Sequence, residues 1–170
     1  SVSDDLEQEG TEHHRSSEDG QAGDYFTDYD KTPASRDLLA HELTHSWNGK
    51  FRRPADLWTP NFNVPMRNNL LWVYEGLTQY WGQVLPTRAE LVTPEFYRES
   101  LAKISGDFDV EVGARWRPMA DTAVAAQQLY NSPDAWTSSR RDTDFYDASI
   151  FLWLDVDAEP AVGDALLERL

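Results

Sequence analysis

Residues 41–45, HELTH, place two histidines on either side of a glutamate, at a spacing that could bind a metal ion. On a helix, positions four apart lie on one face, so His41 and His45 can direct their imidazoles at one cation. Glu42 lies one step further round, where its carboxylate can reach a water on that cation without binding the cation. This arrangement is typical of a zinc hydrolase, in which the glutamate takes the proton of the activated water. So short a pattern also occurs by chance on ordinary helices.

A catalytic zinc requires a third protein ligand, because two histidines leave the tetrahedral site incomplete. His13 and His14 are available in the sequence, and so is Glu75, in the stretch LLWVYEGLTQYW. Glu75 lies beside an apolar helical stripe, where an ionised carboxylate is costly to desolvate without a partner such as a metal ion. A salt bridge to an arginine would serve the same need. The residues alone therefore leave the third ligand open.

The element that must position the two histidines is a helix. Ser35 is a suitable N-cap for a helix near 36–49. Leu39, Leu43 and Trp47 fall roughly on the face opposite the histidines, where they can anchor the helix to a core.

Further helices follow along the chain. The second, near 68–84, is predicted by apolar residues at helical spacing, namely Leu70, Tyr74, Leu77, Trp81 and Val84. Thr93 and Pro94 form a suitable N-cap and first position for a third helix, near 94–106. Residues 119–130 are consistent with a fourth.

The remaining segments are less regular. The apolar run 145–157 favours a buried helix, although its composition also permits a strand. The stretch TEHHRSS, residues 11–17, alternates weakly and predicts an edge strand. Residues 18–35 read as loop, and 50–67, with three prolines, as a long ordered loop. The last eleven residues look helical.

The amino-acid composition excludes some classes of binding partner and metal site. Thirty acidic residues against 15 basic ones give a formal net charge of -15, which argues against nucleic acid or an anionic membrane as a partner. The chain has no cysteine, so disulfides and thiolate zinc sites are excluded. No signal peptide or membrane-spanning run is visible. Because the chain begins with SVSDD, without an initiator methionine, we expect a fragment, and its compartment stays unassigned.

The stretch HELTHSWNGKFRRP, followed by LLWVYEGLTQYW, resembles the glycyl aminopeptidase family of zinc metallopeptidases. These are gluzincins, whose third ligand is a glutamate, as in thermolysin. The family pattern continues HExxH with threonine or serine, tryptophan, asparagine and a basic residue, and then with an aromatic-rich helix containing Glu-Gly-Phe-Thr. Glu75 lies 30 positions after His45, a spacing that fits this family better than that of aminopeptidase N relatives. Leu77 replaces the usual phenylalanine.

The resemblance implies one zinc ion per chain, held by His41, His45 and Glu75, with Glu42 as general base and acid. It implies a mainly α fold, α+β overall, of the thermolysin-like gluzincin type. In that fold a short N-terminal β edge precedes the helical part that carries HExxH. Residues 1–170 would then belong to one metallopeptidase catalytic domain, with 1–34 as its strand and loop edge and 35–170 as its helical zinc-binding part.

Two further stretches support the resemblance. EGTEHHRSS resembles the family's Gly-Gly-Leu-Glu-His segment, which implies that Glu12 binds the free amine of the substrate, although Glu9 replaces the first glycine. DFYDASIFLWLDVD is similar to a segment with an oxyanion-stabilising tyrosine, which implies that role for Tyr146. Here Ala148 and Ser149 replace the Lys-Gly that follows this tyrosine in many gluzincins. Without the resemblance, Glu12 reads as an exposed acid and Tyr146 as a core tyrosine.

The function implied by the resemblance is a zinc-dependent aminopeptidase with a preference for N-terminal glycine or alanine. Its partners would be a peptide with a free N-terminus and other domains of a longer chain, an N-terminal β-rich domain and a C-terminal PDZ domain. Two alternatives remain open. One is a metal-binding scaffold or substrate-docking module without turnover, and the other is an endopeptidase that uses the same zinc chemistry.

Overall fold

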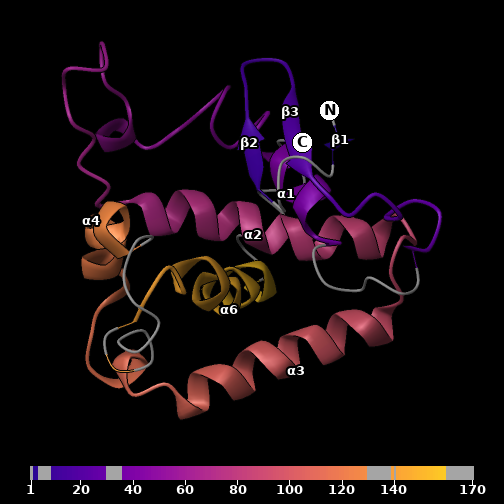
Figure 1. Cartoon of the computed structure of the whole chain (residues 1–170). Coiled ribbons are helices and arrows are strands. Elements are labelled where there is room, and N and C mark those ends of the chain that lie inside the picture. Colours follow the sequence, from indigo (N-terminus) through magenta and orange to yellow (C-terminus); the bar gives the residue numbers. More distant parts are fainter. Residues whose placement is uncertain (1, 4–8, 30–35, 130–138, 140, 160–170) are drawn as a thin grey trace. The chain divides into compact units, whose positions relative to one another are not determined.

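The chain forms two compact units in the computed structural model, which describes residues 2–3, 9–29, 36–129, 139 and 141–159 (Figure 1). The first unit comprises residues 1–53 and 81–101, and the second comprises 54–80 and 102–170. The predicted mainly α fold with a short N-terminal β edge is confirmed. Assignment of the whole chain to one catalytic domain stays a prediction.

The β edge of the first unit is a three-stranded sheet in the order β1-β3-β2. Its strands are β1 (Val2–Ser3), β2 (Gly10–Glu12) and β3 (Ser17–Gly20). β2 and β3 are antiparallel, and the His13 amide donates a hydrogen bond of 2.8 Å to the Ser16 carbonyl in the turn between them. The single edge strand predicted over residues 11–17 is therefore wrong, because this stretch contains the turn of a hairpin.

The two faces of the β2–β3 hairpin differ in burial. Thr11 and Glu18, which are paired across the strands, are exposed. The other face carries residues that are partly or fully buried, namely Gly10, Glu12, Ser17 and Asp19. Because side chains alternate along a strand, these four residues share one face. Gly10 lies against the Leu38 side chain of the following helix, so this is the face that packs on that helix.

Helix α1 (Leu38–Thr44) carries the HELTH motif and is shorter than predicted. Asp37 is its N-cap, whereas Ser35, the predicted N-cap, lies outside the described residues. The predicted anchoring face is also wrong in part, because Leu43 is 53% exposed and Trp47 is 57% exposed. The face of α1 that carries His41 is the buried one.

Helices α2 (Leu71–Arg88) and α3 (Pro94–Val110) confirm the second and third predicted helices, and each contributes residues to both units. Within the first unit, α1 packs closely on α2 at Gly82. A Cβ at this position would lie 3.3 Å from the His41 Cβ. The predicted N-cap of α3 is also confirmed, because the Thr93 hydroxyl accepts a hydrogen bond of 3.1 Å from the Phe96 amide.

The second unit contains helices α4 (Met119–Leu129) and α6 (Phe145–Ala158), so the helical interpretation of 145–157 is confirmed. Its core is formed by Ala123, Ala126 and Phe145. The loop over residues 50–67 is confirmed apart from the short 3-10 helix η3 (Ala55–Leu57). A second 3-10 helix, η4 (Gly113–Arg115), precedes α4. The last eleven residues lie outside the described part of the chain.

Within the second unit, α2 contacts α6 at Gly76, Gln79 and Tyr80. Gly76 permits this approach, because a Cβ there would overlap the Ser149 side chain. Gln79 donates a hydrogen bond of 3.0 Å to Asp147, and the Tyr80 hydroxyl donates one of 2.9 Å to Asp157. Polar contacts thus fix the register of the two helices.

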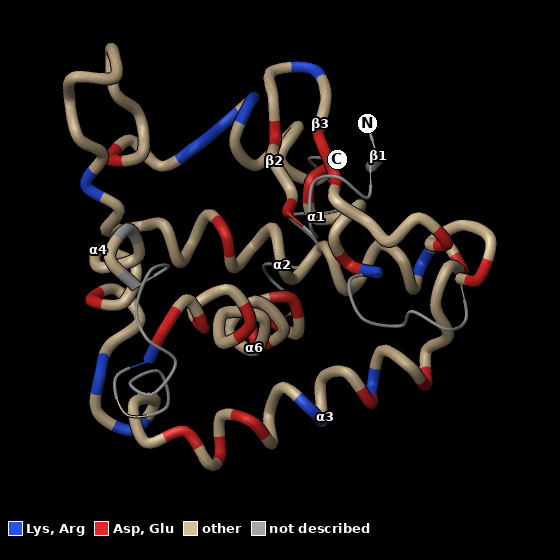
Figure 2. The backbone as a smooth tube through the Cα atoms, in the orientation of Figure 1, with Lys and Arg blue, Asp and Glu red and all other residues tan. Residues whose placement is uncertain are grey.

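Acidic residues are distributed along α3 and α6 (Figure 2).

Among the described residues, no helix is both long and apolar enough to cross a membrane.

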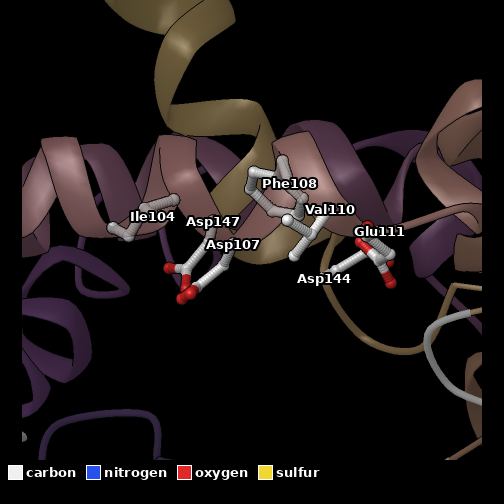
Figure 3. A pocket seen from close by; sticks show the side chains of 7 residues that line it. All are labelled: Ile104, Asp107, Phe108, Val110, Glu111, Asp144 and Asp147. Atoms are coloured by element: carbon white, nitrogen blue, oxygen red, sulfur yellow. The ribbon is translucent and has the colours of Figure 1, made fainter.

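An open groove of about 320 Å³ in the second unit combines acidic and apolar side chains (Figure 3). It is lined by Ile104, Asp107, Phe108, Val110, Glu111, Asp144 and Asp147. Glu111 and Asp144 lie at one end, whereas Asp107 and Asp147 lie at the other. Burial raises the pKa of Glu111 to about 7, and the Asp144 carboxylate adds to this rise. Asp144 itself accepts a hydrogen bond of 2.7 Å from Arg141.

We expect Glu111→Gln to stabilise the chain at pH 8 but not at pH 4.5. The ordinary pKa of a glutamate is 4.5 and that of Glu111 in the fold is about 7. Folding therefore favours its protonated form, and the chain loses stability as the pH rises from 4.5 through 7. Because Glu111 is only partly buried, solvent reduces the effect, and we expect a rise in Tm at pH 8 of about 2–4 °C.

The measurement is thermal unfolding of wild type and variant at the two pH values. Asp109→Asn, which removes an exposed acid two positions earlier on α3, is the matched control. A gain for Glu111→Gln that is the same at both pH values, or is equalled by the control, would contradict the prediction.

Candidate metal centre

His41 in α1 and His45, the C-cap residue of α1, direct the same ring nitrogen at one point. The Nε2 atoms of His41 and His45 are 3.2 Å apart, and their rings are inclined by 80°. Two ligands that each lie about 2.0–2.1 Å from a tetrahedral zinc are about 3.3–3.4 Å apart. The helix therefore holds this nitrogen pair at a spacing that suits a shared zinc ion.

The other ring nitrogen of His45 fixes the orientation of its imidazole. Nδ1 lies 3.0 Å from the Asn48 carbonyl oxygen, so the neutral ring donates its N–H there and presents the lone pair of Nε2 to a cation. The turn that brings this carbonyl back is closed by a hydrogen bond of 2.9 Å from the Lys50 amide to the His45 carbonyl. Gly49 permits the turn with a φ of 148°, which a side chain would disfavour.

Glu42 is buried beside the histidines, with 6% of its surface exposed. Burial raises the pKa of its carboxyl to about 7, against the opposing influence of His41 and His45, and Glu12 and Asp19 add to the rise. Its Oε2 atom is buried and has no hydrogen-bond partner. A water held by a cation on the two histidines would supply one, so the residues present fit a metal ion.

The backbone of β2 closes one side of this centre. Gly10 lies directly against the Glu42 carboxylate, and a Cβ at this position would overlap Oε1. Any side chain here would displace the carboxylate or the strand. Gly10, the glycine of the segment EGTEHH, therefore has a steric function, whereas Glu9, one position earlier, is exposed.

Glu12 lies on the same strand face as Gly10 and is partly buried. Its Oε1 is 3.7 Å from the Lys50 Nζ, in an ion pair whose side chains are 29% and 19% exposed. The acid proposed to bind the substrate amine is therefore beside the metal centre, held by a lysine from the turn that follows His45.

His13 and His14 lie beyond this strand, in the exposed turn of the hairpin. His13 forms an ion pair of 3.7 Å with Glu18, whose side chain is also exposed. Within the described residues, the group of potential ligand atoms that converges within 4.8 Å consists of His41, Glu42 and His45. Neither His13 nor His14 belongs to it.

The remaining two predicted site residues belong to the second unit. Glu75 is 9% exposed, in the middle of the buried part of α2. Tyr146 is partly buried at the start of α6, where its ring stacks on that of Phe145 with centroids 4.9 Å apart. Their predicted roles as third ligand and oxyanion donor stay predictions.

Sequence reasoning missed Asp19, which is 3% exposed on the face of β3 that packs on α1. Its surroundings in the sequence, SSEDGQAG, indicate a loop, in which an aspartate is ordinarily solvated. The alternation of burial along β3 is the signal that distinguishes it, and that alternation depends on recognising the hairpin.

A family model described as M61 glycyl aminopeptidase matches residues 34–152, which is more than half of the chain. The matched range contains α1, α2, α3, α4 and most of α6, and therefore both the histidine pair and Glu75. The sheet with Glu12 and Asp19 precedes it. No curated protein matches the chain.

We expect Gly10→Ala to destabilise the chain. The new Cβ would overlap the Glu42 carboxylate and lie 2.8 Å from the Leu38 Cδ1, so a packed contact must open. Overpacking of this kind costs about 1–3 kcal/mol, which urea unfolding would measure as a lower free energy of unfolding.

Gly106→Ala is the control for this substitution. Gly106 lies within α3, with no heavy atom within 4 Å of an added Cβ, so alanine should stabilise the helix by about 0.5–1 kcal/mol. Effects of the same sign at both positions would show that Gly10 does not have the steric function assigned to it.

Proposed function

Because the chain belongs to the M61 glycyl aminopeptidase family, a family of peptidases, we propose that it is a zinc-dependent aminopeptidase. It would hydrolyse the peptide bond after a free N-terminal residue, and the family description favours glycine at this position. The observation that carries the proposal is the pair of Nε2 atoms 3.2 Å apart with the buried Glu42 carboxylate beside them.

His41 and His45 would provide two of the three protein ligands of the zinc ion. The hydrogen bond from Nδ1 of His45 to the Asn48 carbonyl supports this role, because it leaves Nε2 as the ligand atom. Catalytic zinc sites can be built from imidazole nitrogen and carboxylate oxygen alone, which are ligands that a chain without cysteine can provide.

Glu75 would be the third ligand. Glu75 lies within the range matched by the family model, as does the histidine pair, whereas His13 and His14 precede that range. Glu75 is also 9% exposed in an apolar helix, where a bound cation would favour its ionised form. Both observations support Glu75 over the exposed His13 and His14.

The reaction would proceed through this chain's own side chains around the cation. A bound zinc ion supplies a water with a pKa near 7 and polarises the scissile carbonyl. Glu42 would accept the proton of that water and later deliver it to the leaving amine, a task for which its carboxylate is placed, buried beside the two histidines. Tyr146 would donate a hydrogen bond to the developing oxyanion. Glu12 would bind the α-ammonium group of the substrate.

The buried Glu42 also bears on the rival proposal of a metal-binding scaffold. A scaffold does not need a carboxylate beside its two histidines, and burying one opposes folding unless it is compensated. The packing of Gly10 against this carboxylate indicates that the fold accommodates it. We therefore favour the enzyme over the scaffold.

Zinc content tests the ligand set. We expect one zinc ion per chain for wild type and loss of tight binding for Glu75→Ala, because two histidines alone leave the site incomplete. Glu95→Ala, which removes an exposed acid from α3, should leave the zinc content unchanged. Metal analysis after dialysis against a weak chelator gives the answer, and full zinc content in Glu75→Ala would show that the third ligand lies elsewhere.

Turnover tests the role of Glu42. We expect Glu42→Gln to retain zinc but to lose at least about two powers of ten in kcat on a glycyl-anilide, because the amide cannot accept the proton. Glu18→Gln, on the exposed face of β3, is the control for charge. An active Glu42→Gln enzyme would refute the general-base role, whereas zinc binding without wild-type turnover would favour the scaffold.

A further inference from the structure

Asp19 is a buried acid that the proposed reaction does not yet use. Its residue surface is 3% exposed, and burial raises the pKa of its carboxyl above its usual range. Oδ2 accepts a hydrogen bond of 2.9 Å from the Ser17 hydroxyl, whereas Oδ1 is buried and has no hydrogen-bond partner. A carboxylate oxygen without a donor is costly to bury, so this position calls for a ligand with positive charge or N–H groups.

The strand register directs Asp19 towards the metal centre. Asp19 is paired with Gly10 across the hairpin, and Gly10 lies against the Glu42 carboxylate. Because side chains alternate along both strands, Asp19 and Glu12 share the face that packs on α1, as diagonal neighbours about 7–8 Å apart at the backbone. Asp19 also contributes to the raised pKa of Glu42, which shows that the two carboxylates are within electrostatic reach.

Asp19 is not placed as a ligand of the same metal ion. Within the described residues, the group whose potential ligand atoms converge within 4.8 Å contains His41, Glu42 and His45, without Asp19. Asp19 thus lies close to the centre but outside its ligand set. In a substrate whose scissile carbonyl is at the metal, the α-ammonium nitrogen is two bonds away from the carbonyl carbon. It would therefore occupy a position beside the metal rather than on it.

We propose that Asp19 is a specificity-determining residue that binds the α-ammonium group of the substrate together with Glu12. This inference rests on the proposed aminopeptidase function and adds a second acid to its amine site. An ammonium group has three N–H donors and can bond to two carboxylates at once. Glu12 already has Lys50 as a cationic partner at 3.7 Å, whereas the buried Oδ1 of Asp19 has no hydrogen-bond donor, which the ammonium group of the substrate would supply.

The test compares two zinc-binding probes that differ in the amine alone. Glycine hydroxamate and acetohydroxamate share the metal-binding group, but only the first carries an α-amine. Calorimetric titration of the zinc-loaded chain gives both dissociation constants without requiring turnover. We expect Asp19→Asn to raise the dissociation constant of glycine hydroxamate roughly 10- to 100-fold, the range for the loss of a hydrogen bond to a charged group. The dissociation constant of acetohydroxamate should change less than about twofold.

Glu18→Gln is the matched control, because it removes the same charge one residue away on the exposed face of β3 and should leave both constants unchanged. Glu12→Gln provides a second measurement that does not depend on the folding of the Asp19 variant. If Asp19 binds the amine, Glu12→Gln should retain part of the preference for glycine hydroxamate.

Three results would overturn the proposal. The first is that Asp19→Asn weakens the binding of both hydroxamates equally, and the second is that it does not weaken the binding of glycine hydroxamate. The third is that Glu12→Gln by itself abolishes the preference for glycine hydroxamate over acetohydroxamate. Failure of the proposed function would give a different result. The wild-type chain would then lack zinc, or would not hydrolyse the glycyl-anilide, and either result would be seen before the hydroxamates are compared.

Discussion

The burial of the Glu42 carboxylate between two imidazoles and the backbone of Gly10 is the contact on which the geometry of the site depends. A carboxylate in this position favours its protonated form, and its pKa rises to about 7. The imidazoles oppose that rise, and a cation held by them would oppose it more strongly. A cation bound at this centre would therefore compensate the burial of the ionised Glu42 carboxylate. Stability and chemistry are linked at this one side chain.

Close backbone approach at glycines lets short elements build such a centre. β2 has three residues and α1 has seven, so neither could be stable in isolation. Gly10 lets the strand lie against Glu42, and Gly82 brings α2 against His41. In the second unit, Gly76 does the same between α2 and α6, one residue after Glu75. Removal of a Cβ at each contact lets the neighbouring helix or strand come close enough to position a functional side chain.

The sequence predicted elements whose signals are local, and it failed where the determining contact was distant. The Thr93 cap and the apolar run after Asp144 each depend on nearby residues, and both helices were found. The hairpin was missed because two short strands become stable only by pairing with each other and packing on α1. Leu43 and Trp47 were placed in a core by helical periodicity, which locates opposite faces of a helix without saying which one is buried.

The same distinction separates the candidate site into two parts. His41, Glu42 and His45 were recognisable because the helix alone brings them together, and the family resemblance added Glu75, Tyr146 and Glu12. Asp19 carries no local signal, since an aspartate beside a glycine is expected in a turn. Its function depends on a register across two strands, and on the lysine that pairs with Glu12 but not with Asp19.

Two acids with unequal access to a cation offer a physical basis for selecting amines. Glu12 is partly exposed and has Lys50, so its charge is compensated before any substrate arrives. Asp19 is almost fully buried, and its Oδ1 has no donor, so an incoming ammonium group would relieve a desolvation cost already present in the fold. An acylated nitrogen at the same place brings no charge and leaves that cost uncompensated. Discrimination would therefore come as much from the burial of Asp19 as from any contact with the rest of the peptide.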